Sequence, residues 1–352
     1  MKASADRNNS PAIGHGIRRK ETPPYLSAKE SRILLKCAFG ESVPEKQVRW
    51  GPFVDAARYH RLAPLLPDTV YCDSMPEAVA GKLRDFNRRS EERINRARRG
   101  LAAILAEAEK RDLPLAVFKG PALSQQLYAK RAQRTYYDLD LAVGREQLEA
   151  AEKLMRDLDY EMPPLKSSDL FWMVGRRPRD DGQKQLSHEE TRSLWLTNHF
   201  HMPFVPKDVS AGVRVDLHWS LFQPQRLNFP LKDLLERAEV IAIEGHKALG
   251  FSSPDNLIYL CLHAAVEGYD RVRLIKHLDI LKAGERLSDE EWRQTVDLVR
   301  RYRVAAPFYL GLWVSCAVFG KPVPKAAREF APSYCVSALM NRLISPQALV
   351  HC

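Results

Sequence analysis

Residues 113–143 decide the expected fold, and they read LPLAVFKGPALSQQLYAKRAQRTYYDLDLAV. The apolar run 115–118 has the length and composition of a buried strand. Pro121 suits the first turn of a helix, because its missing N–H would have no partner there, and we expect that helix over 122–129. After a polar, basic turn, a second strand is expected over 136–143. The stretch therefore predicts a strand–helix–strand unit.

The second of these strands carries two aspartates. Asp138 and Asp140 are two residues apart, so their side chains project from the same side of a strand. Leu139 and Leu141 then face the opposite side, towards a core. Neighbouring carboxylates repel each other unless a cation or a proton lies between them, and Mg²⁺ takes such oxygen ligands together with substrate phosphates. Taken alone, the triplet also fits a polar strand with two solvated aspartates, so its surroundings decide between the two interpretations.

A later segment repeats the alternation. We expect strands over 194–205 and 213–221, joined as a hairpin. The second strand reads VRVDLHWSL, which places Asp216 and His218 on its polar face. A neighbouring strand of this kind can bring a third carboxylate beside the first two.

Histidines on these strands raise a competing interpretation. His199 and His201 alternate along the first strand, and together with His218 they have the composition of a zinc site. Histidines that face a neighbouring strand more often pack or form hydrogen bonds, and the carboxylates are ligands for Mg²⁺ rather than Zn²⁺. We therefore favour a magnesium site.

Together these segments resemble the uncharacterised nucleotidyltransferase family of the DNA polymerase beta-like nucleotidyltransferase superfamily. The matching residues are FKGPAL from Phe118, Tyr128, Arg134, DLDLAV from Asp138 and VDLHWSL from Val215. Weaker matches lie at 50–66, at 257–263 (LxxLxxH) and at 273–279 (RLxxxxD), and the resemblance extends over 27–298. One departure from the wider superfamily is that its usual Gly-Ser pair before the helix is Lys119-Gly120 here.

The resemblance implies a magnesium-dependent enzyme. It would move a nucleoside monophosphate from a nucleoside triphosphate to a hydroxyl-bearing acceptor and release pyrophosphate. The three catalytic carboxylates would hold one or two Mg²⁺ ions, and they are Asp138, Asp140 and Asp216. Four further residues would bind the nucleotide, and they are Lys119, Gly120, Arg134 and His218. In this interpretation the glycine lets the backbone approach the phosphates, and the two basic side chains contribute positive charge.

The acceptor is left open between a small hydroxylated molecule, a peptide or protein, and RNA. One alternative within the enzymes is a peptide- or sugar-tailoring transferase of a biosynthetic cluster on the same fold. An alternative from a different class is a non-catalytic nucleotide-binding or interaction module. The presence of all three expected carboxylates argues against the module.

Composition narrows the class of protein. The chain has 352 residues and a formal net charge of +10, which suits anionic ligands such as nucleotides and leaves nucleic acid open without favouring it. No apolar run approaches the roughly 20 residues that span a bilayer, so no membrane partner is expected. The six cysteines are scattered without a C-x-x-C pair, and the polar N-terminus lacks the apolar segment of a secretory signal. We expect a cytoplasmic protein with reduced cysteines.

The expected fold class is α+β. A polymerase-beta-like nucleotidyltransferase core, consisting of a small mixed sheet with flanking helices, would stand between two helical regions. The predicted parts are a disordered tail (1–26), an N-terminal helical region (27–111), the core (112–251) with an irregular insertion (163–192) that includes one helix near 170–174, and a C-terminal helical domain (252–352).

Three further features have a functional and a structural interpretation, and we favour the structural one in each case. His60 stands at the expected end of a helix, where it can satisfy backbone carbonyls. His263 and Asp279 either contact a substrate or link two C-terminal helices. The arginines in the middle of the long helix 76–111 either bind an anionic partner or form a solvated face balanced by acidic neighbours.

Overall fold

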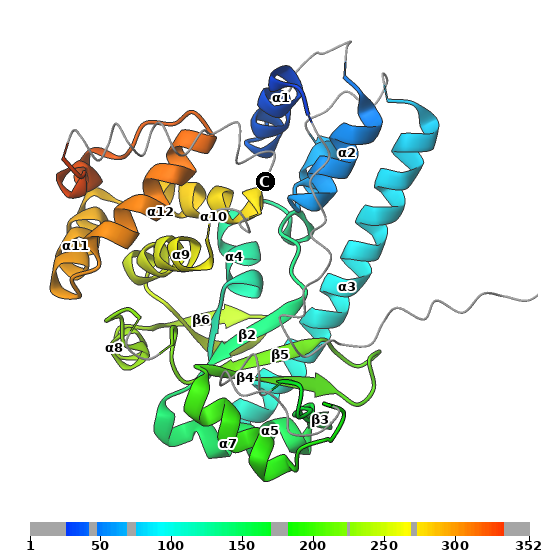
Figure 1. Ribbon diagram of the computed structural model, residues 1–352, viewed down its shortest axis with the longest axis vertical. Helices are drawn as coiled ribbons and strands as arrows, with labels where there is room; N and C mark the ends of the chain where they lie inside the picture. Colours follow the sequence, from blue (N-terminus) through cyan, green and yellow to red (C-terminus); the bar gives the residue numbers. More distant parts are fainter. Residues whose placement is uncertain are drawn as a thin grey trace, which may run out of the picture.

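A seven-stranded mixed sheet forms the centre of the structure, in the order β3-β4-β5-β2-β1-β7-β6 (Figure 1). The structure is a computed structural model, and it describes residues 26–41, 48–68, 75–169, 182–223, 226–268 and 273–333. The strands are β1 (Ala116–Phe118), β2 (Asp138–Ala142), β3 (Tyr160–Glu161), β4 (His201–Pro206), β5 (Arg214–His218), β6 (Glu239–Ile243) and β7 (His246–Gly250). The expected α+β class is confirmed.

Helices precede, interrupt and follow the strands. In the N-terminal half they are α1 (Ala28–Ala38), α2 (Trp50–Tyr59), α3 (Glu77–Lys110), α4 (Gly120–Leu127) and α5 (Leu148–Asp157). In the C-terminal half they are α7 (His188–Asn198), α8 (Leu231–Glu236), α9 (Ser253–Glu267), α10 (Leu274–Arg286), α11 (Asp289–Arg301) and α12 (Ala305–Val318). No helix in the described part of the chain is both long and apolar enough to cross a membrane.

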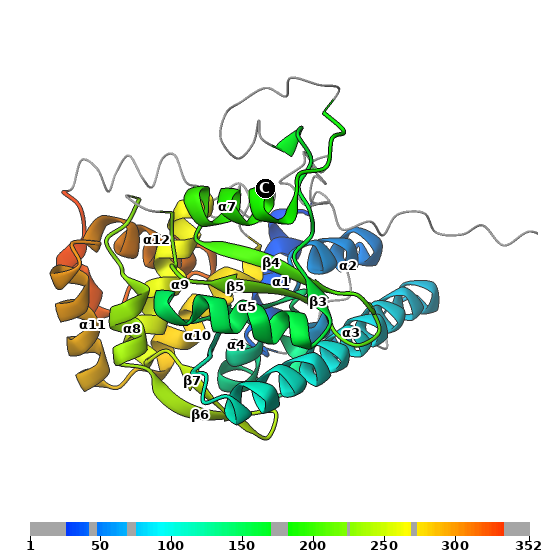
Figure 2. The same ribbon diagram turned by 90° about the horizontal axis from the view of Figure 1, so that it is seen from below.

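β1, α4 and β2 confirm the predicted strand–helix–strand unit. β1 and β2 pair in antiparallel fashion, with Phe118 opposite Asp140. Because side chains alternate along a strand, Val117, Leu139 and Leu141 lie on the other face of the sheet, in a core shared with α3 and α5. These two helices lie next to each other over that face (Figure 2). The face with Asp140 is thereby left for the helices that follow the sheet in sequence.

The helices from the two ends of the chain share one hydrophobic core. Leu34 of α1 and Phe53 of α2 belong to the same group of buried side chains as Phe308 of α12. Phe39, just after α1, meets Phe319, just after α12, edge to face with ring centroids 5.1 Å apart. The helical regions on either side of the sheet segment in sequence are therefore packed together in space (Figure 1).

The predicted strand over 194–205 is wrong in its first half. α7 continues to Asn198, and β4 begins at His201. α7 begins with a capping box: the Glu190 N–H donates to the Ser187 hydroxyl, and the Ser187 N–H donates to the Glu190 carboxylate. The capping box predicts a helix here, whereas the alternation of polar and apolar residues that follows it predicts a strand. The predicted helix near 170–174 lies outside the described residues.

Gly120 provides a test of the packing that starts α4. A β-carbon at this position would lie 2.6 Å from the β-carbon of Tyr136, which is buried in the sheet core. We expect Gly120→Ala to lower the free energy of unfolding by about 1–3 kcal/mol, because the clash is with atoms close to the backbone. Urea unfolding measures the change. In the matched control Gly51→Ala, a new β-carbon meets nothing within 4 Å. Equal stability of the two variants would contradict the prediction.

Candidate functional site

Three carboxylates meet on one face of the sheet. β2 and β5 pair in parallel, with Asp138 opposite Arg214 and Asp140 opposite Asp216. Register partners on neighbouring strands point to the same side, and so do residues two apart on one strand. Asp138, Asp140 and Asp216 therefore share a face, and the second and third are buried.

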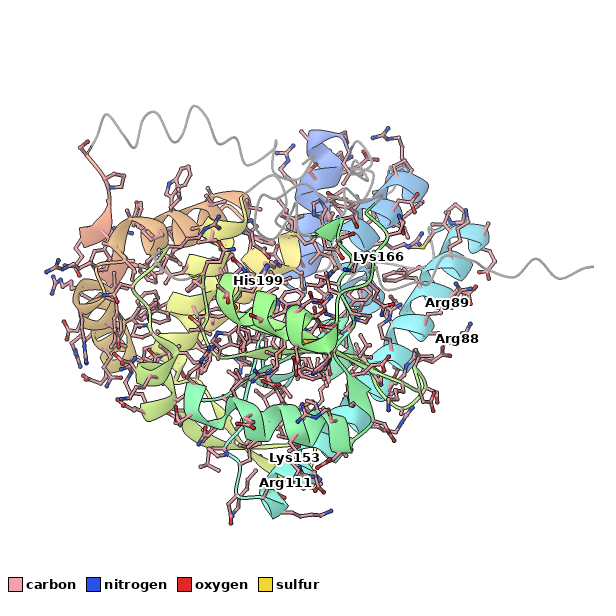
Figure 3. All side chains as sticks on the ribbon, turned by 60° about the horizontal axis from the view of Figure 1, so that its bottom comes forward. Arg88, Arg89, Arg111, Lys153, Lys166 and His199 are labelled. Carbon is pink, nitrogen blue, oxygen red and sulfur yellow. The ribbon has the colours of Figure 1, made fainter. Side chains whose placement is uncertain are left out.

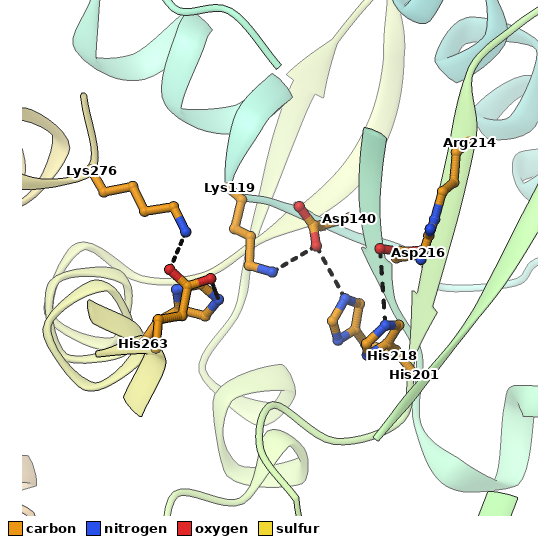
Figure 4. A network of polar contacts seen from close by, with 9 residues as sticks. Lys119, Asp140, His201, Arg214, Asp216, His218, His263 and Lys276 are labelled. Atoms are coloured by element: carbon orange, nitrogen blue, oxygen red, sulfur yellow. Dashed lines mark hydrogen bonds and ion pairs between the residues drawn. The ribbon is translucent and has the colours of Figure 1, made fainter. Parts of the chain in front are cut away.

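Asp140 is held by two basic side chains. The Lys119 ammonium lies 2.7 Å from its Oδ1, and Nε2 of His218 lies 3.1 Å from the same oxygen (Figure 4). Burial favours the neutral acid, but Lys119 and His218 outweigh it and hold the pKa of Asp140 well below its usual range. Asp140 is therefore ionised at any physiological pH.

Asp216 is in a different electrostatic situation. Its Oδ1 accepts a hydrogen bond of 2.7 Å from Nε of Arg214, and its Oδ2 lies 4.0 Å from Nε2 of His201. Burial raises the pKa of Asp216 to about 6, with repulsion from Asp138 and Asp140 adding to the effect and Arg214 opposing it. This carboxylate can therefore exchange a proton near neutral pH.

Asp138 is the carboxylate without a bonding partner in the described part of the chain. It begins β2 and is partly exposed. Burial and the neighbouring Asp140 raise its pKa, while Lys119, Arg61 and Arg214 act in the opposite direction. An anionic group that is surrounded by cations but bonded to none of them is available to a ligand.

Lys119 reaches Asp140 from a strained backbone. Its φ is 51° and its ψ is −125°, a conformation that residues with a β-carbon rarely adopt. Its ammonium lies 5.3 Å from the ring centroid of Phe118 and 5.8 Å from that of Tyr259, and these two rings pack edge to face. Burial opposes the charge, but Asp140 outweighs it and raises the pKa of Lys119. Strain at such a position is typical of a functional site.

His218 is the buried hydrogen-bond partner of Asp140. The ring is 1% exposed, stacks on His201 at 4.8 Å and meets Phe118 edge to face at 4.9 Å. Burial lowers the pKa of His218, so the ring is neutral and Nε2–H donates to Asp140. Its position fits a residue that orients the carboxylate.

Gly120 and Arg134 have structural tasks that the sequence did not reveal. At Gly120 the space for a side chain is filled by Tyr136. Arg134 is buried, and Nε donates to both oxygens of Asp279 on α10, at 3.1 and 2.9 Å. The Tyr128 hydroxyl donates to the same carboxylate at 2.7 Å. This buried cluster fastens α10 to the segment between α4 and β2. Asp279 is therefore structural, as favoured, but it does not link α10 to a second C-terminal helix.

Two histidines outside the sheet also have structural partners. His60 is fully buried, and its Nδ1 accepts a hydrogen bond from the Leu274 N–H at 3.4 Å. It links the end of α2 to the start of α10, as a structural residue, although it bonds an amide rather than a carbonyl. His263 on α9 lies 3.6 Å from Glu267, which also pairs with Lys276 (Figure 4).

The arginines of α3 are distributed between solvent and ion pairs. Arg88 and Arg89 extend away from the helix into solvent (Figure 3), and Arg88 pairs with Glu92 at 2.7 Å. Arg98 forms a bidentate ion pair with Glu244 in the β6–β7 turn, at 3.0 Å. This arrangement agrees with the favoured interpretation of a balanced, solvated face.

The three carboxylates are ligands of the type that a hard divalent cation prefers. All three offer oxygen ligands from one face. Among the described residues, no three His, Cys, Asp or Glu side chains are gathered closely enough to hold a metal ion. The ion pairs explain this: Asp140 is turned to Lys119 and Asp216 to Arg214. To share an ion, the two carboxylates would exchange these partners for it.

Sequence reasoning missed a second group of cations near Asp138. Arg61 follows α2, while Arg273 and Lys276 stand at the start of α10. Arg61 interacts electrostatically with both Asp138 and Arg273, and with Lys276. The sequence did contain a signal for two of them. Arg61 and Arg273 each lie inside a segment that resembles the family, next to His60 and in the match that ends at Asp279.

Comparisons with known proteins identify a family for the chain. A family model described as uncharacterised nucleotidyltransferase matches residues 46–320. The solution structure of the antibiotic-resistance factor ANT(2'')-Ia is 15% identical, with a TM-score of 0.35 over 58% of this chain and 92% of that chain. An antigenic nucleotidyltransferase-like protein from Paracoccidioides brasiliensis is 16% identical, with a TM-score of 0.31 over 60% of this chain and 90% of that chain. No curated protein matches the chain.

The raised pKa of Asp216 predicts a pH-dependent cost to stability. The folded protein holds this proton up to about pH 6, whereas the unfolded chain releases it near pH 4. Ionised Asp216 therefore lowers the free energy of unfolding above pH 6, by about 3 kcal/mol, and this cost fades as the pH falls towards 4. We expect Asp216→Asn to be more stable than the natural chain at about pH 7.5 without divalent ions, with a smaller gain at about pH 5.

Urea unfolding at the two pH values measures this difference. Asp208→Asn is the matched control, because Asp208 is exposed in the β4–β5 turn and Ser210 lowers its pKa. The control should show no such gain. An Asp216→Asn variant that is less stable than the natural chain at both pH values would contradict the assignment of a costly buried charge.

Proposed function

The chain belongs to the uncharacterised nucleotidyltransferase family, and we propose that it moves a nucleoside monophosphate from a nucleoside triphosphate to an acceptor hydroxyl in a Mg²⁺-dependent reaction. The single observation that carries this proposal is the register of β2 and β5, which sets Asp216 beside Asp140 and on the face of Asp138. The family match identifies the chain as a nucleotidyltransferase, and the carboxylates supply the chemistry that such a transfer needs.

Asp138, Asp140 and Asp216 would hold the metal. A divalent cation bound there would neutralise charge on the phosphoryl oxygens and lower the pKa of the acceptor hydroxyl. The low pKa of Asp140 keeps one ligand ionised throughout, and Asp138 is partly exposed. The reaction requires that Asp216 also be ionised. Because its pKa is about 6, Asp216 is mostly ionised above that pH.

Asp216 would accept the proton of the acceptor hydroxyl. The acceptor oxygen forms a bond to the α-phosphorus, the bond from that phosphorus to the bridging oxygen breaks, and pyrophosphate leaves with the electron pair. A pKa of about 6 suits a base that works near neutral pH. Lys119, when it leaves Asp140, would place its ammonium against phosphate oxygens.

Other residues would act by positioning. His218 orients Asp140 from the buried side of the sheet. Arg134 fixes α10 against the segment that precedes β2. Its positive charge is paired with the buried Asp279. Gly120 permits the packing of Tyr136 at the start of α4, where backbone amides face the end of β1. In these roles the three residues would support nucleotide binding indirectly, whereas Arg134 was expected to contact the nucleotide itself.

The proposal includes the domain organisation expected from the sequence. The segment 112–251 would be the catalytic core, with a helical region on either side. The buried cluster around Asp279 and the core shared by Phe53 and Phe308 support the view that both helical regions act as one support for the site. The acceptor is a small hydroxylated molecule, a peptide or protein, or RNA.

Replacement of the carboxylates tests the proposal. We expect Asp138→Asn, Asp140→Asn and Asp216→Asn each to lower Mg²⁺-dependent pyrophosphate release by at least about 100-fold, because each variant loses a charged oxygen ligand or the base. Pyrophosphate release is measured by a coupled phosphate assay with each nucleoside triphosphate, and the acceptor is sought by mass spectrometry of acceptor mixtures.

Asp208→Asn serves as the control and should keep full activity, since Asp208 lies in an exposed turn. Nucleotide binding that needs no metal and gives no turnover would favour a non-catalytic nucleotide-binding module. Full activity of Asp216→Asn would exclude the role given to the β2–β5 register.

A further inference from the structure

Arg61, Arg273 and Lys276 form a cationic cluster beside the carboxylates, where the end of α2 meets the start of α10. The Leu274 N–H donates to Nδ1 of His60 at 3.4 Å, and the Ile275 N–H donates to the His60 carbonyl at 3.3 Å. Two helices that are distant in sequence are thereby joined at one point, and each contributes basic side chains to it.

Arg61 occupies its place at a conformational cost. It follows α2 in the left-handed region, with a φ of 62°, and the Leu62 N–H closes the helix end by donating to the Ala57 carbonyl at 2.7 Å. Glycine is the residue that such a helix end favours, because it lacks a β-carbon. The guanidinium stands 4.5 Å from the ring of Tyr137, which immediately precedes Asp138. An arginine in a position suited to glycine indicates that its side chain is needed there.

The cluster carries more positive charge than its surroundings offset. Lys276 pairs with Glu267, which His263 also contacts. The Arg273 guanidinium lies 3.6 Å from the centroid of Tyr59, and its buried Nη1 has no hydrogen-bond partner among the described residues. Buried donors without partners are costly, and neighbouring like charges repel. An anionic ligand would remove both costs.

We propose that the cationic cluster binds the β- and γ-phosphates of the donor nucleotide, which leave as pyrophosphate. The inference rests on the proposed function, because it assigns one part of the same substrate. Two guanidinium groups and an ammonium match the several negative charges of an oligophosphate, and arginine binds phosphate in a bidentate manner. Lys119 bonds Asp140, and its charge also lowers the pKa of Lys276, so the cluster lies within electrostatic range of the carboxylate site (Figure 4).

The cluster also separates donor from acceptor. With the leaving group held by α2 and α10, the acceptor hydroxyl has to approach from the opposite side of the α-phosphorus for an in-line displacement. Asp216, paired with Arg214, stands on β5 of the sheet, whereas the cluster stands where the end of α2 meets the start of α10. This placement agrees with its proposed role as the base.

Binding of inorganic pyrophosphate with Mg²⁺ tests the cluster directly. The full chain is titrated by calorimetry, and Arg61→Gly and Arg273→Ala are each expected to weaken pyrophosphate binding about tenfold or more. Binding of a nucleoside monophosphate should change less than about threefold, since it lacks the leaving phosphates. Arg61→Gly should also unfold at the same or a higher temperature, because glycine relieves the strain at this helix end.

Arg303→Gly is the matched control. Arg303 follows α11 with a φ of 55° and is exposed, so its replacement relieves a similar strain away from the site. It should leave pyrophosphate binding unchanged. If Arg61→Gly and Arg273→Ala bind pyrophosphate as tightly as the natural chain, the assignment is overturned, even where turnover by the natural chain upholds the proposed function. Variants that keep the KM for the nucleotide but lose affinity for a phosphorylated acceptor would likewise overturn it.

Discussion

The parallel pairing of β2 with β5 is the constraint on which the site depends. It sets Asp216 beside Asp140, although the two lie in distant parts of the sequence. A shift of one residue would turn every side chain of a strand to the opposite face. Leu139, Leu141 and Leu217 prevent such a shift, because they are fully buried on the other side of the sheet. The apolar half of each strand thus determines where the carboxylates are presented.

The buried charge of Asp216 and the strained backbone at Lys119 and Arg61 lower the stability of the folded protein. Asp216 is ionised at neutral pH only against its surroundings, and Lys119 and Arg61 both hold left-handed backbone conformations that suit glycine better. Buried charge and backbone strain of this kind persist where the surrounding fold enforces them and where they contribute to ligand binding. That they gather between the sheet and the start of α10 supports the proposal that this face binds an anionic substrate together with a metal.

Local patterns in the sequence were sufficient for much of the core. The alternation around Asp138 and Asp216 and the proline at the start of α4 identified strands, helix and polar face. What the sequence did not show depends on distant partners. Arg134 is basic and near the carboxylates in sequence, yet Asp279 determines its direction. Arg61 belongs to the site only because His60 binds the start of α10. The capping box at the start of α7 is a local signal that predicts a helix where a strand was expected.

The shared core of the terminal helices has a consequence for synthesis on the ribosome. α1 and α2 are synthesised before the rest of this core, and Phe39 after α1 meets Phe319 only when the segment after α12 has left the exit tunnel. Until then these helices expose surface that can associate with other nascent chains. Fragments that end after the sheet would carry the same exposed surface permanently. Part of the shared core therefore forms only after α12 has been synthesised.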